Sequence, residues 1–151
     1  MSEALSPQVF YCIIKDSKEN LPVGYLGIKD TSAALWEIAI ELDEKYTHKG
    51  FGPRSICLYL NEIQRITGKA EFKALVEVDN IHSQKCFERL KAKLVGLCDS
   101  LVLKTDVERE HFEKRHLDLI DAHMMGLAER LGVEPRKLLS HVLDYRLMCP
   151  L

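Results

Sequence analysis

The sequence lacks an excess of positive charge, because its 21 Lys and Arg residues are balanced by 23 Asp and Glu residues. A formal net charge of −2 gives no electrostatic footprint for nucleic acid or for an anionic membrane surface. The sequence also lacks any apolar run near the ~20 residues that a membrane-spanning helix needs. We therefore expect neither a nucleic-acid partner nor a membrane partner.

The cysteines are few, and their pattern argues against a disulfide or zinc framework. Five is an odd number, and no pair shows CxxC spacing. Most lie among apolar residues, which is typical of reduced, buried thiols in a cytosolic protein. The first residues, MSEALSPQ, have neither the charged nor the apolar region of a secretion signal, so we expect a cytoplasmic location. The cysteines are Cys12, Cys57, Cys86, Cys98 and Cys149.

The stretch from Trp36 to Gly68 is the one around which the chain is organised. Apolar and polar residues alternate from Trp36 to Leu42, as in a half-buried strand. After a polar turn, THKGFG leads into a helix whose first residue we expect to be Pro53, since its missing N–H costs nothing there. Apolar residues recur at helical spacing until Gly68, which offers a C-cap.

The order of strand, glycine-rich turn and helix is suited to binding an anion. The first turn of a helix carries unpaired N–H groups and a partial positive charge. Gly50 and Gly52 let the backbone approach a ligand without a Cβ in the way, so a pyrophosphate is the natural guest. Taken alone, the two glycines also fit an ordinary strand-to-helix turn.

The remaining pattern predicts a mixed α/β (α+β) fold in about one domain. Three strands with short connections favour an antiparallel meander, and a fourth strand after the helix makes a βαβ crossover with a parallel pair. Asn80 can cap a second helix, and residues 94–104 supply one or two short strands. The strands are expected over Val9–Ile14, Leu21–Lys29, Trp36–Leu42 and Phe72–Asp79.

A helical extension is expected after residue 105, so we divide the chain into residues 1–105 and 106–151. One helix is predicted over 106–131 with Gly132 as its stop, and Pro135 is predicted to start another that carries Leu147. The apolar faces of these helices must be covered, either by the sheet or by a second subunit in a homodimer.

The ordered combination of motifs resembles the GNAT superfamily of acyl-CoA-dependent N-acetyltransferases. THKGFG, at Thr47–Gly52, lies at the family's Q/R-x-x-G-x-G/A position between a strand and a helix. NIHSQKCF, at Asn80–Phe87, is similar to the family's N-x-x-(A/S)-x-x-x-Y segment. The resemblance covers residues 9–104 and implies a GNAT-like, mostly antiparallel sheet with a central parallel pair and flanking helices.

The resemblance also implies acetyl-CoA (CoA) as cofactor and a small-molecule or peptide amine as acceptor. It places the pantetheine arm on the strand end, the pyrophosphate on the glycine-rich turn, and Asn80 and Ser83 near the thioester. The implied cofactor contacts are Ile40, Glu41, Leu42, Thr47, His48, Lys49, Gly50, Phe51, Gly52, Asn80, Ser83 and Phe87.

Such enzymes need a base that removes the proton of the attacking amine. Glu37 and Glu41 are candidate catalytic residues, because positions i and i+4 of a strand share one face. Each of them also fits a solvated polar residue of a half-exposed strand.

The sequence departs from the family pattern at several places. Thr47 replaces the usual Gln or Arg, Pro53 offers no N–H, and Phe87 stands where a tyrosine often protonates the leaving thiolate. Only eight residues precede Val9, whereas the family begins with a strand and two helices. We therefore expect residues 106–151 or a second subunit to cover the open sheet face.

The histidines do not indicate a metal site. His116 and His123 are seven residues apart, about 10.5 Å along a helix, which is too far to share one metal directly. His48 and His82 accompany the expected cofactor segments and fit exposed loop histidines as well. The tail could pass for a helix-turn-helix, but from Arg109 onward seven basic residues are matched by seven acidic ones, which disfavours DNA binding.

Three functions therefore stay open. The first is an N-acetyltransferase that transfers acetyl directly to a primary amine, which the intact Gly50-x-Gly52 turn and Asn80 favour. The second is a degenerate, non-catalytic GNAT-like domain that holds acyl-CoA or serves as a scaffold, which the departures favour. The third is a dimeric interaction protein whose helical tail is the working part. We prefer the first.

Overall fold

The computed structural model describes residues 9–151. Contacts within the chain divide it into two compact units, which we describe separately. The first unit holds the described residues up to Ala74, with Cys86–Ala92 and Arg146–Leu151, and the second holds Leu75–Lys85 and Lys93–Tyr145. The division at residue 105 stays a prediction.

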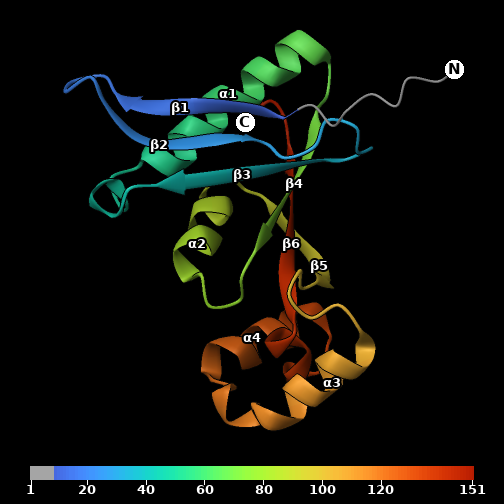
Figure 1. The fold of residues 1–151 in the computed structure, drawn as a ribbon. Helices are drawn as coiled ribbons and strands as arrows, with labels where there is room; N and C mark the ends of the chain where they lie inside the picture. Colours follow the sequence, from blue (N-terminus) through green and yellow to red (C-terminus); the bar gives the residue numbers. More distant parts are fainter. Residues whose placement is uncertain (1–8) are drawn as a thin grey trace, which may run out of the picture. The chain divides into compact units, whose positions relative to one another are not determined.

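The strands form one six-stranded sheet in the order β1-β2-β3-β4-β6-β5 (Figure 1). The first three strands are an antiparallel meander, and β3 pairs with β4 in parallel. The predicted mixed sheet with a central parallel pair is thereby confirmed. The strands are β1 Phe10–Asp16, β2 Leu21–Ile28, β3 Trp36–Leu42, β4 Glu71–Val76, β5 Lys93–Asp99 and β6 His141–Met148.

Four α-helices and three short 3-10 helices complete the described chain. None of the described helices is long and apolar enough to cross a bilayer. The α-helices are α1 Phe51–Thr67, α2 Ile81–Arg89, α3 Asp106–Arg115 and α4 Ala122–Leu131. The 3-10 helices are η1 Glu44–Tyr46, η2 Leu117–Leu119 and η3 Pro135–Leu139.

Helix α1 largely follows the sequence prediction. It ends at Gly68, whose φ of 77° places it in the left-handed region and whose N–H donates to the Gln64 carbonyl. It begins at Phe51, so Pro53 is its third residue and the prediction that Pro53 comes first was wrong. Proline is tolerated throughout this first turn, because its N–H would have no helical partner there.

The core of the first unit lies between the meander and α1, which runs along one face of the three strands in Figure 1. Ile14, Val23 and Leu26 form its buried centre, and Tyr59 of α1 packs against it. The Tyr59 hydroxyl also donates to the Phe10 carbonyl at 2.9 Å, which ties the helix to β1.

The opposite face of the meander carries exposed aromatic residues. Tyr11 and Tyr25 are 50% and 43% exposed, and their rings meet edge to face with centroids 5.8 Å apart. The expectation that residues 106–151 or a second subunit cover the open face of the sheet stays a prediction.

The five cysteines are free, but the prediction that they are buried holds only for Cys149. Cys12 is exposed, because it lies on β1, the outermost strand of the sheet. The other three are intermediate in exposure.

Residues 135–147 do not form the predicted helix. Pro135 opens only the short η3, and residues 141–148 form β6. Val142 to Tyr145 are four consecutive buried residues, a pattern typical of a strand that is covered on both faces. The spacing of leucines and valines in this segment imitated a helical stripe, which led to the wrong prediction.

The prediction of a single helix over 106–131 is also wrong, because the first helix ends at Arg115. Asp121 caps a separate helix, α4, by accepting from the Met124 N–H at 2.8 Å. Thr105 and Glu108 form a capping box at the start of α3. The predicted stop at Gly132 is confirmed, with φ of 64°.

We expect Leu60→Ala to lower the free energy of unfolding by about 2–5 kcal/mol, because Leu60 is fully buried and its loss leaves a cavity. Leu58→Ala, in the same helix but 66% exposed, should change it by less than about 0.5 kcal/mol. Urea unfolding followed by the fluorescence of Trp36, the single tryptophan, measures both. Equal effects of the two substitutions would contradict this core.

Candidate functional site

The connection from β3 to α1 forms a tight turn at Thr47–Gly52. Asp43 caps η1 by accepting from the Lys45 N–H, and the Thr47 hydroxyl donates to the Glu44 carbonyl at 2.8 Å. The chain then passes through His48 and Gly50, whose φ values of 61° and 82° are both left-handed. Gly50 thereby becomes the N-cap of α1.

Aromatic contacts brace this turn from both ends. The rings of Tyr46 and Phe51 meet edge to face with centroids 5.7 Å apart, and both pack against the core of the first unit. The Lys49 ammonium lies 5.2 Å from the centroid of the Tyr46 ring. The turn is therefore anchored by side chains at both of its ends.

The residues of this turn fit a bound phosphate group. The N–H groups of Phe51 and Gly52 lie in the first turn of α1, where no helical carbonyl precedes them. A Cβ built on Gly50 would meet no described heavy atom within 4 Å, so there is room above the backbone. Lys49 and Arg54 are exposed beside it and supply positive charge.

Gly52 lies in close contact with neighbouring side chains. A Cβ on it would lie 3.2 Å from Cys86 Sγ and 3.7 Å from Leu42 Cδ1. Burial raises the pKa of the Cys86 thiol to about 11, so the thiol stays neutral and is no nucleophile at neutral pH. Cys86 is therefore a packing residue beneath the turn.

The two candidate bases lie in different surroundings. Glu37 forms an ion pair with Lys29 at 2.5 Å, and its side chain is only 18% exposed. Glu41 is exposed and accepts a hydrogen bond of 2.6 Å from the Tyr25 hydroxyl. This hydrogen bond raises the pKa of Tyr25 above its usual value. Glu41 is thus the more accessible carboxylate of the pair.

The strand segment predicted to hold the pantetheine arm lies beyond the parallel pairing. The described register of β3 with β4 consists of Trp36 with Phe72 and Glu37 with Lys73. Ile40, Glu41 and Leu42 follow these pairs and lie close in sequence to the turn. Their backbone pairs with β2 on the other side.

In the second unit, Asn80 caps α2 as predicted, because its side-chain oxygen accepts from the Ser83 N–H at 3.0 Å. Gln84, which is 3% exposed, donates from its amide to the Val78 carbonyl at 2.7 Å. Its other amide atom lies 3.0 Å from His123 Nε2. Asn80 and Ser83 are therefore held by a well-bonded helix start.

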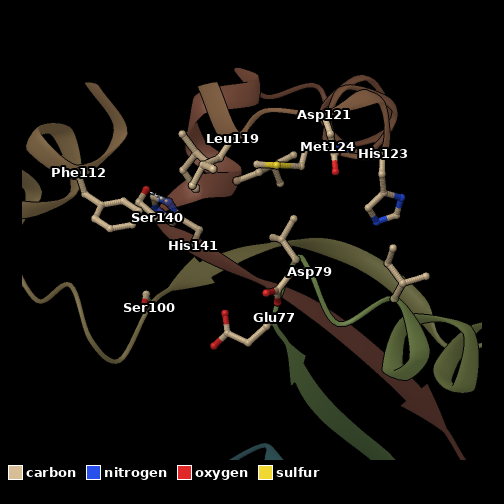
Figure 2. Close-up of a pocket in the computed structure, with 14 residues that line it drawn as sticks. Glu77, Asp79, Ser100, Phe112, Leu119, Asp121, His123, Met124, Ser140 and His141 are labelled. Atoms are coloured by element: carbon tan, nitrogen blue, oxygen red, sulfur yellow. Dashed lines mark hydrogen bonds between the residues drawn. The ribbon is translucent and has the colours of Figure 1, made fainter. Parts of the chain in front are cut away.

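The second unit also contains a pocket that sequence reasoning missed. It has a volume of about 380 Å³ and is lined entirely by residues of that unit (Figure 2). Asp121 and His123 line it, although the sequence pattern of the histidines indicated no site there. The sequence contained one usable signal for this region, which was Asp121 as a helix N-cap. The spacing of apolar residues does not indicate a cavity.

The structure groups most of the predicted cofactor residues in the first unit. Those in the second unit are Asn80 and Ser83. Phe87 lies in the first unit and is 3% exposed, so its ring is a packing group. The assignment of these residues to a cofactor stays a prediction.

Neither the comparison with protein-family models nor that with curated proteins gives a match. Solved structures do match. A ribosomal-protein-S5-alanine acetyltransferase from Vibrio fischeri aligns with a TM-score of 0.62 and 12% identity, over 93% of this chain and 61% of that chain. An acetyltransferase of the GNAT family from Bacillus anthracis aligns with a TM-score of 0.61 and 14% identity, over 91% and 65%.

A third match is Mycobacterium smegmatis RimJ in complex with CoA-disulfide, with a TM-score of 0.61 and 15% identity over 94% of this chain and 54% of that chain. The chain therefore has the fold of the GNAT superfamily. It spans less than two thirds of the length of these solved chains. At such identities the likeness establishes the fold, and activity is a separate question.

We expect Gly52→Ala to lower the free energy of unfolding by about 1–3 kcal/mol, because its Cβ overpacks against Cys86. Cys86→Ala removes the opposing sulfur, so the double variant should be more stable than the sum of the single effects predicts. Gly126→Ala, in helix α4 with open space around its Cβ, is the control and should be neutral or stabilising. Simple additivity of the two changes would argue against the contact.

Proposed function

We propose that the chain is an acyl-CoA-dependent N-acyltransferase that uses acetyl-CoA and transfers its acetyl group directly to a primary amine. The observation that carries this proposal is the turn at Thr47–Gly52, which offers first-turn N–H groups and open space at Gly50 on a GNAT fold. Such a helix start is suited to a pyrophosphate. A cytoplasmic location and a homodimer belong to the same proposal.

Different residues of the chain bind different parts of acetyl-CoA. The backbone of Ile40, Glu41 and Leu42 binds the pantetheine arm, and the turn with His48 and Lys49 binds the phosphates. Asn80 and Ser83 contact the thioester end. When bound, acetyl-CoA supplies an acyl thioester that is activated toward amines.

Glu41 accepts the proton of the attacking amine in this proposal. It is the exposed member of the pair, whereas Glu37 is held in its ion pair with Lys29. The Tyr25 hydroxyl orients the Glu41 carboxylate through their hydrogen bond. General-base assistance of this kind contributes about 10²–10⁴-fold to a rate.

A second candidate is a non-catalytic domain that binds acyl-CoA without turnover. Phe87 favours it, since its buried ring has no hydroxyl to protonate a leaving thiolate. Pro53 favours it as well, because it removes one backbone donor from the first turn of α1.

Acetyl-CoA binding is tested first by a thermal melt of the full chain. At about 100 times its Kd the ligand adds roughly 2.7 kcal/mol to the stability, which raises Tm by several degrees. We expect Gly50→Glu to abolish this rise, because a carboxylate side chain fills the open space above the turn and repels phosphate.

Gly68→Glu is the matched control for that melt. Gly68 has the same left-handed φ and the same open surroundings, but it lies at the other end of α1. Each rise in Tm is compared with the same variant without ligand, so any strain from the substitution cancels. A rise lost equally in both variants, or absent in the parent, would remove the basis of both candidate functions.

The second test separates turnover from binding. We expect Glu41→Gln to lower kcat with primary amines by about 10²-fold or more, while the acetyl-CoA-dependent rise in Tm persists. Glu37→Gln should have a much smaller effect, and Glu44→Gln, an exposed neighbour in η1, should have none. Unchanged kcat in Glu41→Gln would exclude it as the base, and a parent with binding but no turnover would favour the second candidate.

A further inference from the structure

The pocket of the second unit is built by the segment between β5 and β6. Residues 100–140 contribute α3, α4, η2 and η3, and side chains from all four line a cavity of about 380 Å³. Its other wall is the chain that follows β4. The volume lies in the range of pockets for small molecules, about 300–1,000 Å³.

The charged lining of this pocket is of one sign. Glu77 and Asp79 lie on the β4 side, and Figure 2 shows Asp121 on the opposite side, at the start of α4. Of the described residues that line the pocket, none is Lys or Arg. Three carboxylates facing a shared space create a potential that attracts a cation.

His123 adds a hydrogen-bond acceptor to the same lining. The Gln84 amide nitrogen donates to the Val78 carbonyl, so its oxygen is the atom that lies against His123 Nε2 and accepts a hydrogen bond from it. In the uncharged form of the ring this contact places the proton on Nε2, which leaves Nδ1 as an acceptor. A buried side chain, Gln84, thus fixes the tautomer of a pocket residue.

The rest of the lining is largely apolar. Met124 and Leu138 are buried, and Phe112 is stacked on His116 with ring centroids 4.0 Å apart. In Figure 2 Phe112 lies at one end of the pocket and His123 at the other. This arrangement suits a ligand with a cationic head and a compact apolar body.

We propose that this pocket binds the acyl acceptor and that the acceptor is a small primary ammonium carrying an apolar group. The role as acceptor rests on the proposed acyl transfer: Asp79 and Ile81, which flank Asn80, line the pocket, and Asn80 is assigned to the thioester end. The carboxylates and His123 hold the ammonium, and the apolar side chains of the lining hold the body.

The probe is 2-phenylethylamine, titrated into the full chain without any CoA and followed by amide chemical shifts. We expect shifts in the residues that line the pocket, which lie in 77–81, 121–124 and 138–141 and at positions 100, 112 and 119, with a Kd at or below about 10 mM for a ligand of this size. The neutral analogue 2-phenylethanol and the anionic analogue 3-phenylpropionate should bind at least about tenfold more weakly. Spermidine, an extended cation, should bind more weakly than 2-phenylethylamine.

Charge-neutral variants identify the residues responsible. Asp121→Asn removes the charge but keeps a good N-cap for α4, so the helix should persist. We expect the triple variant Glu77→Gln, Asp79→Asn, Asp121→Asn to bind the amine about tenfold more weakly. Asp118→Asn, an exposed acidic residue outside the pocket, should leave the affinity unchanged.

Equal binding of the alcohol, shifts confined to residues that do not line the pocket, no saturation, or full affinity in the triple variant would overturn the proposal. Tighter binding of spermidine than of 2-phenylethylamine would overturn the proposal that the ligand carries an apolar group. Because the titration contains no CoA, its failure is distinct from a failure of the acetyl-CoA melt. If the amine binds but acetyl-CoA does not raise Tm, the pocket is an amine site and the proposed acyl transfer is wrong.

Discussion

The left-handed conformation at Gly50 is the constraint on which the rest of the first unit depends. It ends the turn that follows β3 and starts α1 in one step, so that the first N–H groups of the helix follow directly on the turn. A side chain there would cost strain in the backbone and would occupy the space above the donors. The edge-to-face contact of Tyr46 with Phe51 then keeps both sides of the turn in place.

The sequence predicted the framework of this site because its signals are local. Alternation from Trp36 to Leu42, the stop at Gly68 and the cap at Asn80 each depend on a few neighbouring residues, and each is found in the structure. The start of α1 was misplaced by two residues, since proline is tolerated anywhere in the first helical turn.

Elements that depend on tertiary packing could not be predicted from the sequence. Strand β6 was predicted as helix, because an apolar run buried on both faces has no period that distinguishes it. The pocket was not predicted for a similar reason: Glu77, Asp121 and Ser140 are far apart in sequence and line one cavity only in the folded second unit. The difference between Glu37 and Glu41 likewise depends on a neighbouring segment, because Tyr25 of β2 binds Glu41 and Lys29, directly after β2, binds Glu37. A rigid framework with variable insertions is the usual way in which one fold acquires different substrates.

In the proposed function the start of α1 binds the pyrophosphate of a CoA ligand. The most direct measurement of this binding is the amide chemical shift of residues 48–52 during a titration with CoA. We expect Phe51 and Gly52 to shift most among the residues of α1, because their N–H groups gain charged acceptors. Saturating CoA that leaves these two amides unchanged would contradict it.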